Sequence, residues 1–235
     1  MKNNLLFYYY SSVLMFLLAT FPARASVTLS STNFPDDNFR VAVAQAAGVS
    51  EGGTFNEATL TTLDVSGESI TSLKGLEPLT GLTDLDISGN SSLTTGADLR
   101  GLTALVTLKA SNCNLRGLDG TTATYNGNAM ASLLIGSGNS ALRYLDLSHN
   151  VRFYYSGNLQ YLTHLETLLL NDCTYFDFWG YQPGLGMSSL KYVDVSNCAA
   201  MDRIYLRGAT QLQHLNAEGT LVRGFTTSPS NSATS

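Results

Sequence analysis

The stretch Leu142-Arg-Tyr-Leu145-Asp-Leu147-Ser-His-Asn150 determines how this chain can fold. Leu145 and Leu147 are separated by one polar residue, and this period of two predicts a short β-strand with both leucines on one face. Asn150 predicts a turn after the strand, because its amide can bond to backbone groups of the turn and of a neighbouring segment. Nine residues cannot bury these leucines alone, so the stretch predicts a stable fold only if it recurs.

The same pattern occurs seven times along the chain. Each copy has apolar residues at its first, fourth and sixth positions, and the copies begin at Leu60, Leu82, Leu105, Leu142, Leu165, Leu190 and Leu212. Successive copies start 22, 23, 37, 23, 25 and 22 residues apart, and the long interval indicates an insertion at residues 119–141. Stacked copies bury one another's apolar residues. We therefore predict an α/β solenoid with a parallel β-sheet on its concave face and short helices, 3₁₀ turns and loops on its convex face.

These units resemble the leucine-rich repeats of secreted bacterial proteins, including the internalin-like type with short repeats of about 22 residues. The resemblance covers residues 60–225. It implies a curved solenoid at the cell surface or outside the cell that binds another molecule. It does not name that molecule, because this scaffold serves many different ligands.

Residues 1–25 have the features of a secretory signal peptide. A basic residue near the start is followed by an apolar run over residues 5–21, and Ala23-Arg-Ala25 fits a small-residue cleavage site before Ser26. The alternative is an uncleaved membrane anchor, for which the apolar run is short. We therefore predict secretion, with the periplasm, the cell surface and the medium as the possible destinations.

The charge of the secreted chain limits the kinds of molecule that it is expected to bind. Cleavage before Ser26 leaves 11 basic and 18 acidic residues, a net charge of −7. The remaining lysines and arginines form no basic stripe along the repeats. Nucleic acids and anionic membranes attract basic surfaces, so we expect neither of them as a partner.

Residues 26–59 are expected to form an N-terminal helical cap. A helix is predicted over residues 34–47, with Asp36 and Asp37 at its positive end and Gly48 as its stop. The segment Phe34-Pro-Asp-Asp-Asn-Phe-Arg40 resembles the start of the N-terminal cap in some surface leucine-rich repeat proteins. In several of those proteins, an EF-hand-like loop follows this segment. The loop at residues 48–59 lacks most of the carboxylates that calcium needs, so we predict no metal there.

The three cysteines fit the repeat register. Cys113, Cys173 and Cys198 occupy the position that Asn90 and Asn150 hold in their own repeats. We interpret them as buried thiols of the turn, although stacked coils would also permit a Cys173–Cys198 disulfide. The residues indicate no metal ligand set and no cofactor.

The segments outside the regular repeats are less well specified. The insertion at residues 119–141 is Gly-, Thr- and Asn-rich at first and then apolar, and we expect a loop and a short outer helix capped by Asn128. Residues 226–235 are small and polar, and we predict a disordered tail there.

A catalytic set is not visible in the sequence. His149, His164 and His214 fall in different repeats, and the serines follow the repeat phase without a Ser–His–Asp order. One register position holds Asp64, Asp86, Asp146 and Asp194. Paired acids could serve glycoside hydrolysis, but a stacked row of repeat residues is the simpler interpretation. We predict a protein that is not an enzyme.

The side chains between the apolar strand positions should form the concave surface. The C-terminal part of this surface holds Tyr144, Leu169 and Tyr192, which we predict to bind a partner. Leu169 is expected to be exposed, where a repeat would normally place a polar residue. In the N-terminal part, Lys109 is expected to bridge Asp86 and Asp146.

A second aromatic group lies in the turns after two of the strands. Phe153 and Phe176 hold an ordinary apolar position and should be core. The additional aromatic residues, which we predict to bind a partner, are Tyr154, Tyr155, Phe178, Trp179 and Tyr181. The alternative is that these aromatic residues fold over the 25-residue repeat that begins at Leu165 and cover its core. The sequence thus predicts a module that binds an extracellular protein, with carbohydrate binding through the turn around Trp179 as the alternative.

Overall fold

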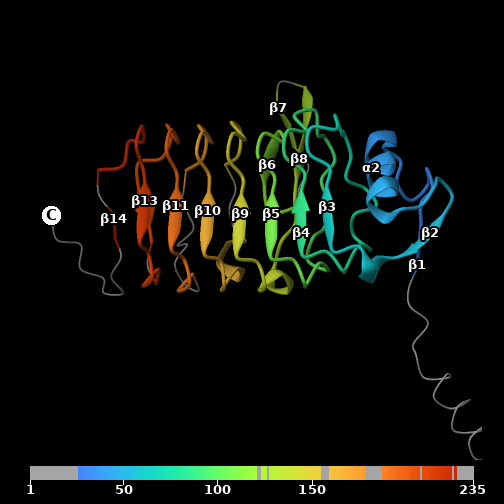
Figure 1. The fold of residues 1–235 in the computed structure, drawn as a ribbon. Coiled ribbons are helices and arrows are strands. Elements are labelled where there is room, and N and C mark those ends of the chain that lie inside the picture. Colours follow the sequence, from blue (N-terminus) through green and yellow to red (C-terminus); the bar gives the residue numbers. More distant parts are fainter. Residues whose placement is uncertain are drawn as a thin grey trace, which may run out of the picture.

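The computed structural model describes residues 26–120, 123–125, 127–154, 159–177, 187–206, 208–223 and 225–226. Its main element is a parallel sheet of seven strands, one from each repeat (Figure 1). From one edge to the other the strands are β3 (Thr62–Asp64), β4 (Asp84–Asp86), β5 (Thr107–Lys109), β9 (Tyr144–Asp146), β10 (Thr167–Leu169), β11 (Tyr192–Asp194) and β13 (His214–Asn216). Their spatial order follows the chain, so the predicted solenoid is confirmed.

The core lies between this sheet and the return segments. The middle residues of the first six strands are at most 2% exposed, and they are Leu63, Leu85, Leu108, Leu145, Leu168 and Val193. Complete burial of one such leucine contributes about 1.5–3 kcal/mol. In the repeats, the described return segments contain 3₁₀ helices at Ser137–Asn139 and Leu159–Tyr161 and no α-helix.

One residue in every turn after a strand has a left-handed backbone. The seven residues share the eighth position of the repeat, with φ between 52° and 76°, and they are Gly67, Gly89, Asn112, His149, Asp172, Asn197 and Gly219. Glycine adopts this conformation without strain, and Asn, Asp and His are the other types enriched in it. The repeated left-handed residue turns the chain sharply, and in the five inner repeats the next side chain is buried in the core.

That next position is the ladder of asparagines and cysteines. Asn150 is 1% exposed, donates from Nδ2 to the oxygens of Ala110 and Leu147 at 2.8 Å, and accepts from the amides of Cys113 and Leu115 at 2.9 Å. Cys173 instead donates from Sγ to the oxygen of Leu147 at 3.2 Å. The three cysteines are buried and unpaired, so the buried-thiol interpretation is confirmed and no disulfide is formed.

The N-terminal end of the sheet is covered by α2 (Asp37–Ala47). This helix begins at Asp37 rather than at residue 34, because Asp36 is its N-cap and accepts the amide of Phe39 at 3.0 Å. The other carboxylate oxygen of Asp36 accepts the amide and the hydroxyl of Thr71, at 2.8 and 2.7 Å. One side chain therefore starts the helix and ties it to the first coil. The helix ends at Gly48, as predicted.

Further contacts fix the cap. Strand β1 (Ser26–Thr28) pairs antiparallel with β2 (Thr54–Asn56), which leads into the 3₁₀ helix Glu57–Thr59. Arg40 is only 9% exposed, donates to the oxygen of Phe34 at 2.9 Å, and pairs with Asp37 and Glu51 at 2.8 and 3.0 Å. Phe39 is fully buried, with its ring centroid 5.8 Å from that of Phe34. The cap is thus packed and hydrogen-bonded to the coil beneath it.

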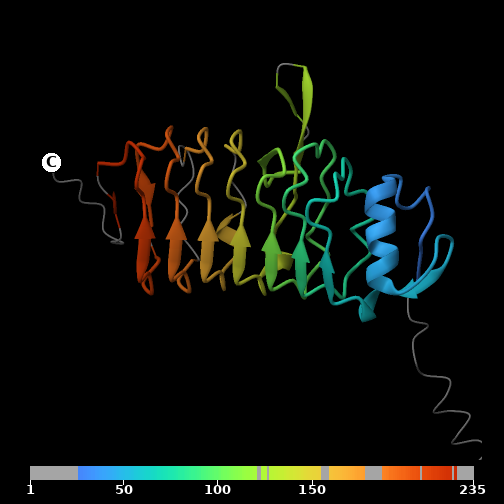
Figure 2. The ribbon, with the colours of Figure 1, turned by 45° about the horizontal axis from the view of Figure 1, so that its top comes forward.

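The prediction for the insertion is wrong. Instead of a helix capped by Asn128, the segment forms a hairpin of β7 (Ala123–Tyr125) and β8 (Asn128–Ser132), and β8 also pairs parallel with β6 (Leu115–Gly117). The hairpin projects from the solenoid (Figure 2). The sequence Asn126-Gly127 between the two strands is a strong signal for a two-residue hairpin turn, and our prediction overlooked it.

The C-terminal end of the solenoid has a less completely buried core than the inner coils. Strand β12 (Ile204–Tyr205) pairs parallel with β14 (Phe225–Thr226) in a separate two-stranded sheet. In the last coil, Leu212 and Leu215 are only partly buried, although their counterparts in the inner coils are fully buried. Of the helices in the described ranges, none has the length and apolarity needed to cross a bilayer.

Candidate binding surfaces

The concave face consists of two rows of side chains from the seven strands. The first row is Thr62, Asp84, Thr107, Tyr144, Thr167, Tyr192 and His214, and the second is Asp64, Asp86, Lys109, Asp146, Leu169, Asp194 and Asn216. The strand register sets each residue directly beside the corresponding residue of the next repeat. All of these residues are partly or fully exposed, because the alternate strand positions are the ones that face the core.

The three concave residues singled out from the sequence lie on three adjacent strands. Tyr144 of β9 is half-buried, and Tyr192 of β11 is 37% exposed. Leu169 of β10 is half-buried rather than fully exposed, and Asp146 and Asp194 lie beside it in the row. Burial raises the pKa of the Tyr144 hydroxyl, and the nearby Asp146 carboxylate acts in the same direction.

A third ring belongs to this group, although the sequence analysis did not select it as a binding residue. His214 of β13 stacks on Tyr192, with ring centroids 4.5 Å apart and planes 13° from parallel. The signal was available, because His214 holds the same register position as Tyr144 and Tyr192. The C-terminal part of the first row is therefore Tyr144, Thr167, Tyr192 and His214.

The concave aspartates serve the turns and also charge the surface. Asp86, Asp146 and Asp194 each accept the amide two residues further on at 2.9–3.0 Å. Asp64 accepts the amide of Ser66 in the same way, and this hydrogen bond lowers the pKa of the Asp64 carboxyl group. The rows hold five aspartates and one lysine, so the face is acidic.

The expected lysine bridge is only half present. Lys109 Nζ lies 3.3 Å from a carboxylate oxygen of Asp86, and no such pair joins Lys109 to Asp146. One ammonium group turned towards Asp86 does not also reach the strand on its other side. Asp146 therefore keeps its negative charge without a lysine or arginine partner among the described residues.

The turns after the strands form the second surface, which we call the turn side. Phe153 and Phe176 are fully buried with ring centroids 5.6 Å apart, as predicted. Tyr154 is 46% exposed and lies under the guanidinium group of Arg116, 4.8 Å from the ring centroid. Tyr155, Phe178, Trp179 and Tyr181, the other predicted residues of this group, lie outside the described residues.

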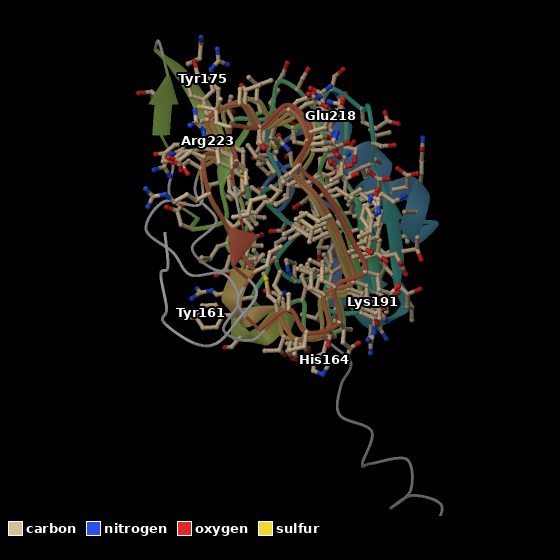
Figure 3. All side chains as sticks on the ribbon, turned by 90° about the vertical axis from the view of Figure 1, so that its left-hand side faces the viewer. Tyr161, His164, Tyr175, Lys191, Glu218 and Arg223 are labelled. Atoms are coloured by element: carbon tan, nitrogen blue, oxygen red, sulfur yellow. The ribbon has the colours of Figure 1, made fainter. Side chains whose placement is uncertain are left out.

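Tyr175 extends the turn side by one coil, and the sequence analysis did not single it out as a site residue. It is 53% exposed, and its amide donates to the oxygen of Val151, which is 49% exposed. Viewed along the solenoid, Tyr175 lies at the turn side and Lys191 lies beside the sheet (Figure 3). The turn side and the concave face are therefore different surfaces of the same coils.

In the described turns, the polar groups belong to the repeat pattern. His149 Nδ1 lies 3.3 Å from Asp172 Oδ2, but these residues are the left-handed turn residues of adjacent coils. Burial raises the pKa of the Cys113 and Cys198 thiols to about 12, which keeps them protonated and unreactive at neutral pH. Within the part of the chain that the structure describes, no three His, Cys, Asp or Glu side chains converge on a metal position.

The comparison with protein families identifies the repeats. Residues 34–223 match the model described as the Endo-beta-N-acetylglucosaminidase EndoS LRR domain. The chain belongs to this leucine-rich repeat family. The match includes α2 of the cap and all seven strands of the main sheet.

A curated relative agrees with the family match. Internalin J of Listeria monocytogenes is 45% identical over 64 residues, which are 26% of this chain and 7% of that protein. The chain thus spans a small part of the length of this relative. The predicted resemblance to internalin-like bacterial leucine-rich repeat proteins is confirmed.

Solved internalin structures are also similar to the chain. The functional domain of InlJ from Listeria monocytogenes, which includes a cysteine ladder, matches with a TM-score of 0.29 and 22% identity over 85% of this chain and 63% of that one. An internalin (inlF) from the same species matches with a TM-score of 0.38 and 20% identity, over 89% of this chain and 68% of that one.

Proposed function

We propose that this leucine-rich repeat protein is a non-catalytic module that binds another protein outside the cell or at its surface. The observation that supports the proposal is the group Tyr144, Leu169 and Tyr192 on the concave face. Residues of these two rows are not needed for the core, so large side chains there are available to a partner. Tyrosine is also enriched among the residues that dominate binding energies.

Membership of the leucine-rich repeat family supports a role in interaction, because the repeats provide a long regular surface. Export is supported by the signal-peptide features of residues 1–25, which lie outside the described residues. The protein purified from outside the cytoplasm is expected to begin at Ser26 when its N-terminus is sequenced. An N-terminus at residue 1 would contradict cleavage.

The binding role can be tested by screening the purified protein against extracellular proteins. The triple variant Tyr144→Ala, Leu169→Ala, Tyr192→Ala is expected to lose at least tenfold in affinity for a protein hit, as loss of hot-spot residues does. A matched control replaces Thr62 and Thr107, which lie in the first row but on strands nearer the cap. Equal affinity of the triple variant and the unchanged protein would exclude the assigned surface.

A second candidate function is carbohydrate binding on the turn side. Tyr154 and Tyr175 are exposed there, and the enzyme named in the family description acts on an N-acetylglucosamine linkage. Aromatic rings with polar tips suit the apolar faces of sugars. A glycan hit that is lost in Trp179→Ala and kept in the Tyr144, Leu169, Tyr192 triple variant would support this function. A glycan hit that survives Trp179→Ala would contradict it.

A further inference from the structure

The concave face has a spacing that suits one flat group. Tyr144 and Tyr192 are in register on β9 and β11, with only Thr167 of β10 between them. Adjacent strands are about 4.8 Å apart, so the two tyrosine backbones are separated by roughly 9.6 Å. A group stacked between two rings needs about 3.5–4 Å on each side, or about 7–8 Å in total. Thr167, the residue between them, has a smaller side chain than either tyrosine.

The rings are also partly held in place. Tyr192 stacks on His214 at 4.5 Å, which occupies the side of the ring away from Thr167. Tyr144 is half-buried on the opposite strand. Because part of their rotamer freedom is already lost, these rings lose less entropy on binding than fully exposed tyrosines would.

The second row supplies charge and an aliphatic surface beside these rings. Asp146, Leu169 and Asp194 lie on the same three strands, two residues further along. The two nearest lysines are engaged elsewhere, since Lys109 pairs with Asp86 at 3.3 Å and Lys191 pairs with Glu166 at 2.7 Å. In the ranges that the structure describes, neither Asp146 nor Asp194 has a cationic partner, although Asn216 donates to Asp194 at 3.2 Å.

We propose that the concave face between Tyr144 and Tyr192 takes an arginine side chain from a basic segment of the partner protein. The guanidinium group is flat, stacks on aromatic rings and bonds carboxylates such as Asp146 and Asp194. The aliphatic part of the arginine packs on Leu169. A second copy of this acidic chain is a poor occupant, because its net charge of −7 after cleavage before Ser26 repels the face. This inference rests on the proposed protein-binding function and adds the chemistry of the partner.

The test uses the purified protein and three labelled peptides of the form Gly-Ser-X-Gly-Ser-X-Gly-Ser-X-Gly, with Arg, Lys or Gln at X. Dissociation constants are measured by fluorescence anisotropy at two salt concentrations. The Arg peptide is expected to bind at least tenfold more tightly than the Gln peptide and about threefold more tightly than the Lys peptide, in line with cation–π strengths. Equal binding of the Arg and Gln peptides would overturn the inference.

Variants separate a specific arginine site from general attraction to an acidic protein. Tyr192→Ala changes no charge and is expected to lower the affinity for the Arg peptide about five- to tenfold. Asp146→Asn is expected to lower this affinity by a similar factor. Asp84→Asn removes the same charge from the first row on β4, and is expected to weaken the peptide less than twofold. If Asp84→Asn acts as strongly as Asp146→Asn while Tyr192→Ala has no effect, the attraction is diffuse and the inference is wrong.

The protein screen distinguishes failure of this inference from failure of the proposed function. A protein partner that is lost in the Tyr144, Leu169, Tyr192 triple variant, but keeps its affinity when its own basic residues are neutralised, supports the function and overturns the arginine site. A partner that binds the triple variant as well as the unchanged protein overturns both. A partner that loses affinity both for the triple variant and when its own basic residues are neutralised supports the proposed function and the arginine site.

Discussion

The two ends of the sheet differ in how completely the same repeat position is buried. At the cap end, Leu63 of β3 is 1% exposed, since α2 packs on the outer side of its coil. At the other end, Leu215 of β13 has the same position in its repeat but is only partly buried. A repeat does not bury its own leucines; the neighbour on each side does so. Identical sequence positions therefore contribute different amounts of stability.

The largest expected effect lies in the cap. Phe39→Ala removes a fully buried ring that packs on Phe34, and it should lower the free energy of unfolding by about 3–5 kcal/mol. Urea unfolding followed by circular dichroism measures this change. Val41→Ala is the matched control, because Val41 is 54% exposed on the same helix and should change little. Equal losses in both variants would mean that α2 is not packed as described.

The comparison of the two ends is tested directly by one pair of variants. Leu63→Ala should cost about 2–5 kcal/mol, whereas Leu215→Ala should cost about 1–2 kcal/mol because less apolar surface is lost. The same unfolding measurement applies to both. A cost for Leu215→Ala as large as that for Leu63→Ala would show that the last coil is as well buried in solution as the first.

A smaller effect is expected where the cap meets the first coil. Asp36→Ala removes the N-cap of α2 and its bonds to Thr71, and should cost about 1–2 kcal/mol at neutral pH. Burial raises the pKa of Asp36, but the hydrogen bonds from Phe39, Thr71 and Ser72 outweigh it and leave the pKa below its ordinary value of 3.8.

This pKa sets the pH dependence of the cap. A carboxyl group with a lowered pKa in the folded state stabilises the protein above its unfolded pKa, and this stabilisation is lost as the pH falls through the folded value. The difference in unfolding free energy between the unchanged protein and Asp36→Ala should therefore be constant near neutrality and shrink below about pH 4. Asp36→Asn is the control, since it keeps an acceptor for Phe39 and removes the titration. A difference that grows on acidification would contradict the assignment.

The smallest effect is expected between the two ends. Glu166 accepts Arg143 at 2.9 Å and Lys191 at 2.7 Å, and so links three coils on the surface. Exposed ion pairs contribute little, so Glu166→Gln should leave the urea midpoint nearly unchanged, and high salt should erase any difference. A loss comparable to that of Asp36→Ala would mean that surface charge, rather than neighbour packing, holds adjacent coils together.

The candidate surfaces show where sequence reasoning stops. The register alone predicted that Tyr144 and Tyr192 share a row, because strand residues alternate strictly between two faces. It did not show that Leu169 is half-buried or that Lys109 turns to Asp86 alone, since both depend on side-chain conformations set by neighbours. The stack of Tyr192 on His214 required the distance between two rings, which a spacing of residues does not contain.

The sequence by itself determined the solenoid, the start of each coil and the buried thiols, because these follow from a short pattern repeated seven times. The turn-forming residues at the eighth position, from Gly67 to Gly219, are equally local. The Asn126-Gly127 signal for the β7–β8 hairpin is local as well, although our prediction overlooked it. Tertiary structure decided the remaining features: the tie of Asp36 to Thr71 and the unequal burial of Leu63 and Leu215. Each of these depends on contacts between segments whose separation in the chain has no fixed period, so no local pattern encodes them.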